Sequence, residues 1–220
     1  MKLMIRKVIQ TTLMACLFGC VAGSGYAQAG KPLYENNFEQ IKVGEKPEDF
    51  LILDGAFAVQ EGEGNKTLEL PGAPLDTYGA LFGPTLKNDI SVTARIFGTK
   101  KGRRFPTFAV GLNGQSGYRL QVSPGKGELE LYHGDDLVAH VPYEWKSGEW
   151  TWLKLQSRTS SEGCRLEGKA WTRGTTEPEK ALISFEDKAK PAAGRSAIWG
   201  SPYATTPIQF DDLKVESLAP

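Results

Sequence analysis

Apolar and polar residues alternate along most of the chain after residue 30. The run Ile90–Phe97 is typical, with Ile90, Val92, Ala94 and Ile96 on one side and Ser91, Thr93, Arg95 and Phe97 on the other. A period of two is the pattern of a half-buried β-strand, because successive side chains of a strand point to opposite faces of its sheet. The pattern predicts strands with one apolar face turned to a core and one face that mixes Arg, Glu and aromatic residues.

Fourteen such runs follow one another, separated by Gly, Pro, Asn or Asp. They are Leu33–Phe38, Ala56–Gln60, Thr67–Leu70, Tyr78–Phe82, Ile90–Phe97, Thr107–Asn113, Tyr118–Ser123, Glu128–Tyr132, Leu137–Pro142, Trp150–Ser157, Arg165–Thr172, Ala181–Glu186, Arg195–Gly200 and Ile208–Ser217. Many short strands at regular spacing indicate a sandwich or a barrel. No composition break or internal repeat divides them, so we expect one all-β domain, residues 30–220.

The first 29 residues have the pattern of a secretion signal. A basic start precedes a largely apolar, uncharged run that ends at Val21, and Ala27-Gln28-Ala29 provides a small-x-small cleavage site. We expect export and removal of residues 1–29. The alternative is a lipoprotein signal, because Leu17-Phe18-Gly19-Cys20 resembles a lipobox whose Cys20 would carry the lipid. The predicted locations are the periplasm, the exterior or, through Cys20, the outer membrane.

Charge and cysteine content narrow the expected partners. Three of the 26 basic residues and none of the 26 acidic ones lie in residues 1–29, so the rest of the chain has a formal net charge of −3. A mildly acidic domain is a poor match for a phosphate backbone, and we expect no nucleic-acid partner. No apolar run after residue 30 is long enough to span a bilayer. Cys164 is the only cysteine after residue 29, so no internal disulfide can form there, and its apolar alternation places it in the core.

Three parts of the chain resemble the concanavalin A-like lectin/glucanase superfamily, which includes laminin-G-like jelly rolls and bacterial 3-keto-disaccharide hydrolase-like domains. They are Leu33–Glu39 with Asp54–Phe57, Trp150–Leu155 with Leu166–Trp171, and Ile208–Val215. The resemblance is one of strand rhythm over nearly the whole chain after residue 29. It implies a two-sheet antiparallel jelly-roll sandwich, with the first and last strands side by side and a concave sheet that commonly forms the sugar-binding face.

Polar and aromatic side chains on the strand faces are the candidates for a sugar site. Aromatic rings stack on the C–H faces of sugars, and planar polar groups hydrogen-bond to their hydroxyls. If their strands are neighbours, one face would gather Arg95, Arg119, Gln121, Glu130, Tyr132, Glu167 and Trp171. The alternative is a solvated face with cross-strand ion pairs.

Carboxylates on one strand face raise an enzymatic alternative. Glu128 and Glu130 project to the same side of a strand, within the range of about 5–9.5 Å that glycosidases need between two carboxyls. The Glu-x-Asp-x-x-Glu strand of the superfamily's family-16 glucanases is absent, and an exposed pair of Glu residues is the simpler interpretation. In such a hydrolase the candidate catalytic residues are Glu130 and Glu167.

We expect no required cofactor, with a structural Ca²⁺ as the one candidate. The superfamily frequently holds Ca²⁺ near the chain ends, and Asp211, Asp212 and Glu39 would converge there if the first and last strands pair. A transition-metal site is less favoured, because His133 and His140 lack a third strong ligand.

The run Lys100-Lys101-Gly102-Arg103-Arg104 is a basic hairpin tip between two predicted strands. Such a tip is either a solvated turn or a contact for an anionic glycan or a lipid headgroup.

The leading hypothesis is an exported carbohydrate-binding β-sandwich protein of the bacterial cell envelope. One alternative is a glycoside or 3-keto-glycoside hydrolase that acts on a saccharide in the concave groove. The other is a non-catalytic structural or adhesive envelope protein, because a fold alone does not fix a function.

Overall fold

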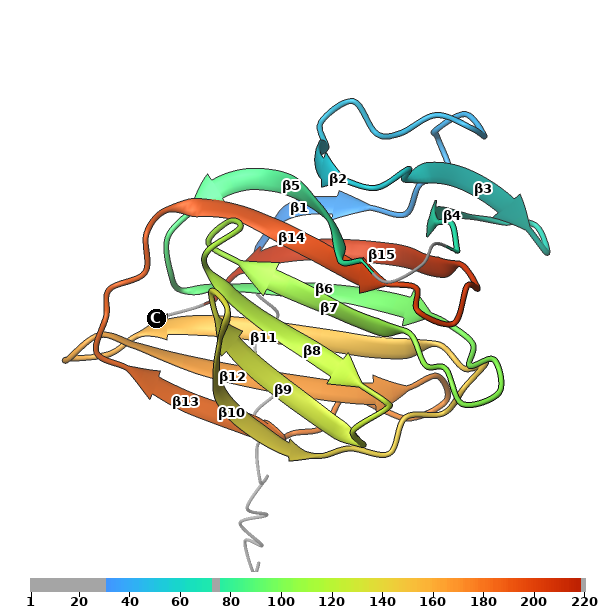
Figure 1. Ribbon diagram of the computed structural model, residues 1–220. Coiled ribbons are helices and arrows are strands. Elements are labelled where there is room, and N and C mark those ends of the chain that lie inside the picture. The colour runs from blue at the N-terminus through green and yellow to red at the C-terminus, as the bar shows by residue number, and fades with distance from the viewer. Residues whose placement is uncertain (1–30, 73–75, 219–220) are drawn as a thin grey trace, which may run out of the picture.

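The computed structural model describes residues 31–72 and 76–218, which form two antiparallel β-sheets stacked face to face (Figure 1). The predicted signal segment, residues 1–29, lies outside the described residues, and so does Cys20. The described residues contain no helix, and therefore none that is long and apolar enough to cross a membrane.

Sheet A contains eight strands in the order β13-β12-β11-β6-β15-β4-β3, with β1 paired to β15. Its strands are β1 (Lys31–Asn36), β3 (Ala58–Gly62), β4 (Asn65–Leu70), β6 (Ile90–Phe97), β11 (Thr151–Thr159), β12 (Cys164–Thr172), β13 (Ile183–Asp187) and β15 (Ile208–Ser217). The antiparallel pairing of β1 with β15 confirms that the first and last strands lie side by side.

Sheet B contains seven strands in the order β10-β9-β8-β7-β14-β5-β2. They are β2 (Leu51–Asp54), β5 (Tyr78–Leu86), β7 (Thr107–Leu112), β8 (Tyr118–Ser123), β9 (Glu128–His133), β10 (Asp136–Pro142) and β14 (Gly194–Ser201). The consecutive strands β7 to β10 form a meander, because each connection between them is a short turn rich in Gly.

The core lies between the sheets and contains the apolar half of each alternating run. Fully buried side chains from the central strands are Val92, Ala94, Ile96, Leu153 and Leu155 of sheet A and Leu120, Val122, Leu129 and Leu131 of sheet B. Each Val, Leu or Ile among them contributes roughly 1.5–3 kcal/mol relative to an exposed position. Cys164 is also fully buried, as the sequence predicts.

Strand β2 is missing from the sequence prediction. Its residues Leu51, Ile52 and Leu53 are three consecutive apolar side chains, so they carry no alternation. The strand is an edge strand that pairs only with β5, and Leu51 is 53% exposed. A short edge strand buries neither face completely, so its sequence lacks the two-residue period that marks the other strands.

The connection between β1 and β2 is fixed against the sandwich by aromatic contacts. The ring of Phe38, fully buried, lies 6.2 Å from that of Phe50, and Phe50 stacks on Phe82 of β5 at 5.5 Å. The Phe38 N–H donates to Asn36 Oδ1 at 2.8 Å, which closes the turn after β1. These contacts hold residues 37–49 beside the outer side of sheet A.

Candidate functional site

The seven predicted sugar-binding residues divide between the two outer sides of the sandwich. Sheet B carries Arg119, Gln121, Glu130 and Tyr132, whereas sheet A carries Arg95, Glu167 and Trp171. The expectation of one shared face is therefore wrong. Alternation tells which side chains point outward, but it does not tell which sheet a strand joins.

The sandwich has two outer sheet surfaces. The β8 face is the outer side of sheet B, formed by the outward side chains of β7, β8, β9 and β14. The β11 face is the outer side of sheet A, formed by those of β6, β11, β12 and β15.

A groove of about 710 Å³ lies on the β8 face. The strands supply Thr107, Arg119, Gln121, Ser123 and Ser201, the β8–β9 turn supplies Gly125 and Lys126, and the flanking loops supply Thr77, Arg103, Arg104, Phe105, Tyr203 and Thr205. Its volume is in the range of small-molecule binding sites. None of the described residues that line it is Asp or Glu.

The apolar floor beside the groove is centred on Trp199 of β14. Its ring packs with Leu81, Ala109 and Ala197 in a small cluster outside the main core. A Cβ on Gly79 would lie 2.4 Å from two ring atoms of Trp199. Glycine at that position therefore lets the indole lie flat against the sheet.

Arg119 lies between two aromatic rings. Its guanidinium carbon is 4.7 Å from the centre of the Tyr132 ring and 5.8 Å from that of Trp199. The Nε atom is buried without a hydrogen-bond partner, and no described carboxylate lies within ion-pair distance of this guanidinium. The rings hold the cation in place and leave its N–H groups without an acceptor.

Glu130 lies beneath this arrangement and is fully buried. It accepts hydrogen bonds from Lys126 Nζ at 2.6 Å, from the Tyr132 hydroxyl at 3.0 Å, from Gln121 Nε2 at 3.2 Å and from the Ser123 hydroxyl. Burial acts to raise the pKa of Glu130, but the hydrogen bonds outweigh it and the pKa is lowered. Glu130 is thus an ionised residue that positions Gln121 and Lys126.

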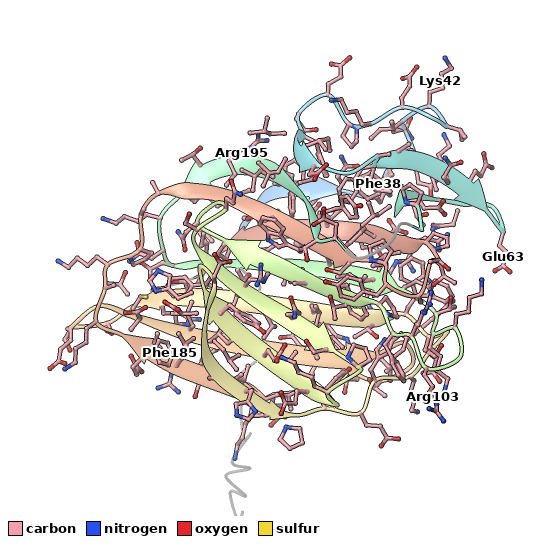
Figure 2. All side chains as sticks on the ribbon, viewed as in Figure 1. Phe38, Lys42, Glu63, Arg103, Phe185 and Arg195 are labelled. Carbon is pink, nitrogen blue, oxygen red and sulfur yellow. The ribbon has the colours of Figure 1, made fainter. Side chains whose placement is uncertain are left out.

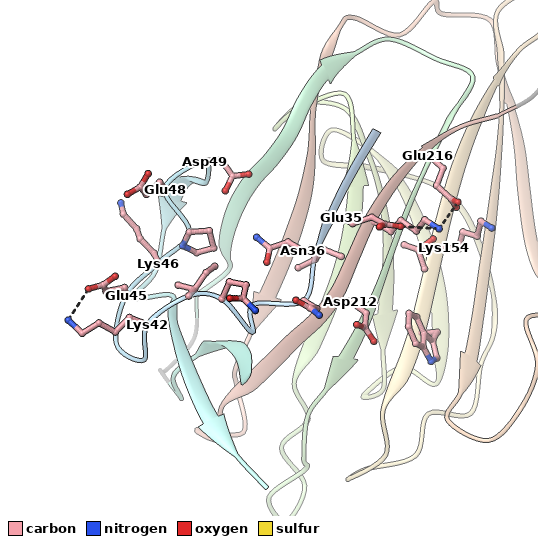
Figure 3. Close-up of a pocket in the computed structure, with 18 of the residues that line it drawn as sticks. Glu35, Asn36, Lys42, Glu45, Lys46, Glu48, Asp49, Lys154, Asp212 and Glu216 are labelled. Carbon is pink, nitrogen blue, oxygen red and sulfur yellow. Dashed lines mark hydrogen bonds and ion pairs between the residues drawn. The ribbon is translucent and has the colours of Figure 1, made fainter. Parts of the chain in front are cut away.

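A second and larger groove, of about 1250 Å³, lies on the β11 face (Figure 3). One wall is the β1–β2 connection, with Lys42 and Glu45. Trp152 and Trp171 are among the other residues that line the groove. These two indoles are cross-strand neighbours with parallel planes, 7° apart, and with centroids separated by 5.9 Å.

Charged side chains on the β11 face are paired with one another. Arg95 Nη2 lies 2.5 Å from Asp211, and Arg95 Nε lies 2.9 Å from Asp212. The further pairs are Lys154 and Lys169 with Glu177, Lys214 with Glu35 and Glu216, and Arg165 with Glu167. This face therefore matches the alternative prediction of cross-strand ion pairs.

The candidate catalytic carboxylates are not brought together. Glu130 is on the β8 face and Glu167 is on the β11 face, where Gln156 and Arg165 bind it. Glu128, the neighbour of Glu130 on β9, lies 3.1 Å from His140 Nδ1. Because Glu130 is buried and ionised, it has no proton to give to a leaving group.

The residues expected to hold Ca²⁺ do not fit that ion. Arg95 occupies the space beside Asp211 and Asp212, within ion-pair distance of both, and Asp211 also accepts a hydrogen bond from Asn65 at 2.9 Å. Glu39 instead accepts from the Lys66 N–H. Within residues 31–72 and 76–218, no three His, Cys, Asp or Glu residues gather around a metal-sized space. A Ca²⁺ site stays a prediction without support from these side chains.

The two histidines contact different carboxylates and do not contact each other. His133 Nδ1 is 2.9 Å from Asp187, whereas His140 contacts Glu128. In the β9–β10 hairpin His133 pairs with Asp136 and His140 with Glu130, so the two imidazoles are not cross-strand partners.

Comparison with known proteins finds no matching family model and no matching curated protein. Solved structures do match. The carbohydrate-binding module CBM66 from Bacillus subtilis is 13% identical, with a TM-score of 0.53, over 77% of this chain and 96% of that one. Lectin II from Ulex europaeus is 12% identical, with a TM-score of 0.56, over 86% of this chain and all of that one. The chain folds as a concanavalin A-like jelly roll.

A third neighbour of this jelly roll is a catalytic domain. The glycoside hydrolase family 131 domain from Coprinopsis cinerea is 9% identical, with a TM-score of 0.54, over 85% of this chain and 94% of that one. Binding modules, lectins and hydrolases thus share the fold, so the side chains of each face must decide between functions.

Of the residues that line the β8 groove, only Arg119 and Gln121 belong to the predicted site. Tyr203, Thr205 and Phe105 lie in loops, and Trp199, beside the groove, lies on β14, at the far side of β7 from β8 in the strand order. Their sequence neighbourhoods carry no signal for the groove, since only the folding of the loops over β7 and β8 brings them there. Arg103 and Arg104 did stand out as a basic turn, and the Lys101–Arg104 bridge confirms that turn.

Proposed function

We propose that this protein binds carbohydrate in the groove on the β8 face. The observation that carries the proposal is Arg119, a guanidinium held between two rings with its N–H groups left without a protein acceptor. Hydroxyl and carboxylate oxygens of a saccharide would complete those hydrogen bonds. On the β11 face, Arg95 Nε also lacks a well-aligned hydrogen bond, but that guanidinium lies within ion-pair distance of Asp211 and Asp212. Lys154, Lys169 and Lys214 of that face each have a carboxylate partner as well.

Aromatic and amide groups around Arg119 suit a sugar. The rings of Phe105 and Tyr203 are half-buried in the groove walls, where a sugar C–H face would pack against them. Gln121 donates to Ser123 at 2.9 Å and to Glu130, so its carbonyl oxygen is left to accept from a hydroxyl. The printed names of the structural neighbours, a carbohydrate-binding module and a lectin, agree with binding of this kind.

Retention on immobilised polysaccharides tests the proposal. We expect Tyr203→Ala and Phe105→Ala to weaken binding by at least about tenfold, a loss of about 1.4 kcal/mol, because each removes a ring from the groove wall. Trp171→Ala is the matched control, since it removes an aromatic ring of the β11 face. We expect that variant to bind like the unchanged protein.

Two results would contradict the proposal. Loss of binding in Trp171→Ala alone would move the site to the β11 face. Failure of the unchanged protein to be retained on any member of a broad glycan panel would remove carbohydrate as the ligand.

We also propose that the binding takes place outside the cytoplasm, at the cell envelope, on the basis of the signal pattern of residues 1–29. The mass of the protein recovered from cell fractions tests this step. An N-terminus at Gly30 indicates cleavage, one at a lipid-modified Cys20 indicates anchoring, and an intact Met1 would overturn the proposal.

A further inference from the structure

The lining of the β8 groove carries only positive charges. Its charged residues are Arg103, Arg104, Arg119 and Lys126, and none of the described lining residues is acidic. Lys126 is neutralised by Glu130 from below, at 2.6 Å. Three guanidinium groups are therefore left without a carboxylate partner among the described residues.

This excess of cations is specific to the groove. The chain as a whole has 26 basic and 26 acidic residues. On the β11 face, the cations Arg95, Lys154, Lys169 and Lys214 all have carboxylate partners within ion-pair distance. The groove thus has a local positive potential that the composition does not require.

Arg119 is suited to bind an anion in particular. Its ring contacts use the flat face of the guanidinium, whereas a carboxylate or a sulfate binds the in-plane N–H groups at its edge. A buried donor without an acceptor is unfavourable, and a charged acceptor would remove that penalty. The partial burial of Arg119 also weakens solvent screening of such a contact.

Two further arginines stand at the groove rim. Arg103 and Arg104 are exposed residues of the β6–β7 turn, which is closed by two backbone hydrogen bonds between Lys101 and Arg104. Phe105 anchors this turn near Gly125 of the β8–β9 turn, since a Cβ on Gly125 would lie 3.9 Å from the Phe105 ring. A ligand in the groove would therefore meet Arg119 on the floor and a guanidinium pair at the edge.

We infer that the saccharide bound in the β8 groove is anionic and carries a carboxylate or a sulfate ester. This inference rests on the proposed carbohydrate binding and adds the chemical class of the ligand. Both groups place negatively charged oxygen atoms on a sugar ring, and Arg119 would bind those oxygens. Gln121, Tyr203 and Phe105 would contact the rest of the sugar.

The test uses pairs of polysaccharides that differ in charge alone. Polygalacturonate is compared with its methyl-esterified form, and dextran sulfate with dextran, using the full chain as it is processed by the cell. We expect the charged member of at least one pair to bind at least about tenfold more tightly than its neutral partner. The dissociation constant should rise steeply between about 0.1 M and 1 M NaCl, where the screening length falls from about 10 to 3 Å.

Variants then assign the charge effect to the groove. Arg119→Met and the double variant Arg103→Met/Arg104→Met are each expected to reduce the preference for the charged polysaccharide at least about fivefold. The rim double variant lies in an exposed turn, so it remains informative if Arg119→Met folds poorly. Lys42→Met is the matched control, because Lys42 is exposed and lies far from Arg103 (Figure 2).

The possible results separate this inference from the proposed function. Equal binding of neutral and charged partners, with loss in Tyr203→Ala, would overturn the anionic class and keep carbohydrate binding. An equal loss in Lys42→Met and in the arginine variants would overturn the inference in favour of diffuse charge attraction. Binding only to phosphatidylglycerol vesicles would replace the saccharide with a lipid headgroup, and no polysaccharide binding at all would reject both proposals.

Discussion

Arg95 on the β11 face and Arg119 on the β8 face have closely matched settings. Each lies on a strand in the interior of its sheet, and each guanidinium carbon is 4.7 Å from the centre of an aromatic ring, Trp150 for Arg95 and Tyr132 for Arg119. The Nε atom of each lacks a well-aligned hydrogen bond. They differ in their ion pairs, because Asp211 and Asp212 lie within ion-pair distance of Arg95, whereas no described carboxylate lies that close to Arg119. One arginine therefore serves the fold, and the other is available to a ligand.

A similar contrast separates the grooves on the two faces. The β11 groove is the larger, yet its charges are of both signs and include ion pairs such as Lys154 with Glu177 and Lys214 with Glu35. The β8 groove is smaller and of one sign. Size alone would select the β11 groove as the functional site, whereas guanidinium groups without a carboxylate partner select the β8 groove. We regard the second criterion as the better one, since a saccharide contributes hydrogen bonds that a self-paired surface does not need.

The largest expected effect compares the two arginines in stability. Arg95→Met would leave Asp211, which is 1% exposed, as a buried carboxylate without its cation, and we expect a loss of about 3 kcal/mol in the free energy of unfolding. Arg119→Met would remove no ion pair and would keep an apolar stem between the rings, so we expect a change within about 1 kcal/mol. Urea denaturation of both variants at pH 7 measures the difference.

Binding provides the converse readout for the same two variants. Arg95→Met should bind polysaccharide like the unchanged protein under conditions where it is folded, and Arg119→Met should not. Equal destabilisation by the two substitutions would show that Arg119 is a structural residue. It would contradict the assignment of Arg95 to the fold and of Arg119 to a ligand.

Most strands and the core could be predicted from the sequence, because a strand with one buried face has an apolar residue at every second position. Leu120, Val122, Leu129 and Leu131 alternate with polar residues, and all four are fully buried. The edge strand β2 could not be predicted in this way, because its sequence does not alternate. It pairs with one strand only, and the side chain of Leu51 is exposed.

The site was only partly predictable, because alternation leaves open which sheet each strand joins. The nine residues between β6 and β7 carry the chain from sheet A to sheet B, whereas the short turns after β7, β8 and β9 keep the next strands in sheet B. Arg119, Gln121, Glu130 and Tyr132 were therefore grouped correctly by neighbouring hairpins. Arg95 was assigned to them wrongly, since the long connection before β7 changes the sheet.

The loop residues of the groove could not be predicted from the sequence for another reason. Tyr203 follows β14 in the chain, yet it lines the same groove as the turn that follows β8. That approach depends on the pairing of β14 with β7, which is a contact between segments about 90 residues apart. Local pattern carries no information on such a pairing.

The smallest expected effects concern the two faces at acid pH, where they should respond with opposite signs. The folded-state pKa of Glu130 is lowered, so its contribution is complete above its unfolded value near 4.5 and is lost as the pH falls through the folded value. Burial and the charge of Asp211 raise the pKa of Asp212, so the ionised form of Asp212 opposes folding, and this effect grows as the pH rises through its folded value.

Matched amide variants make these signs measurable. We expect Glu130→Gln to be less stable than the unchanged protein by about 1–2 kcal/mol at pH 7, with the gap narrowing toward pH 3 as Glu130 becomes protonated in the reference. Asp212→Asn should gain stability relative to the unchanged protein on going from pH 3 to pH 7, because the amide never ionises. Urea denaturation across this pH range measures the difference in the free energy of unfolding between each variant and the unchanged protein. If the free energies of unfolding of the two variants changed with pH in the same way, Glu130 would not be an ionised positioning residue. Protonation destabilises the folded protein only where the fold favours the charged form of the carboxylate.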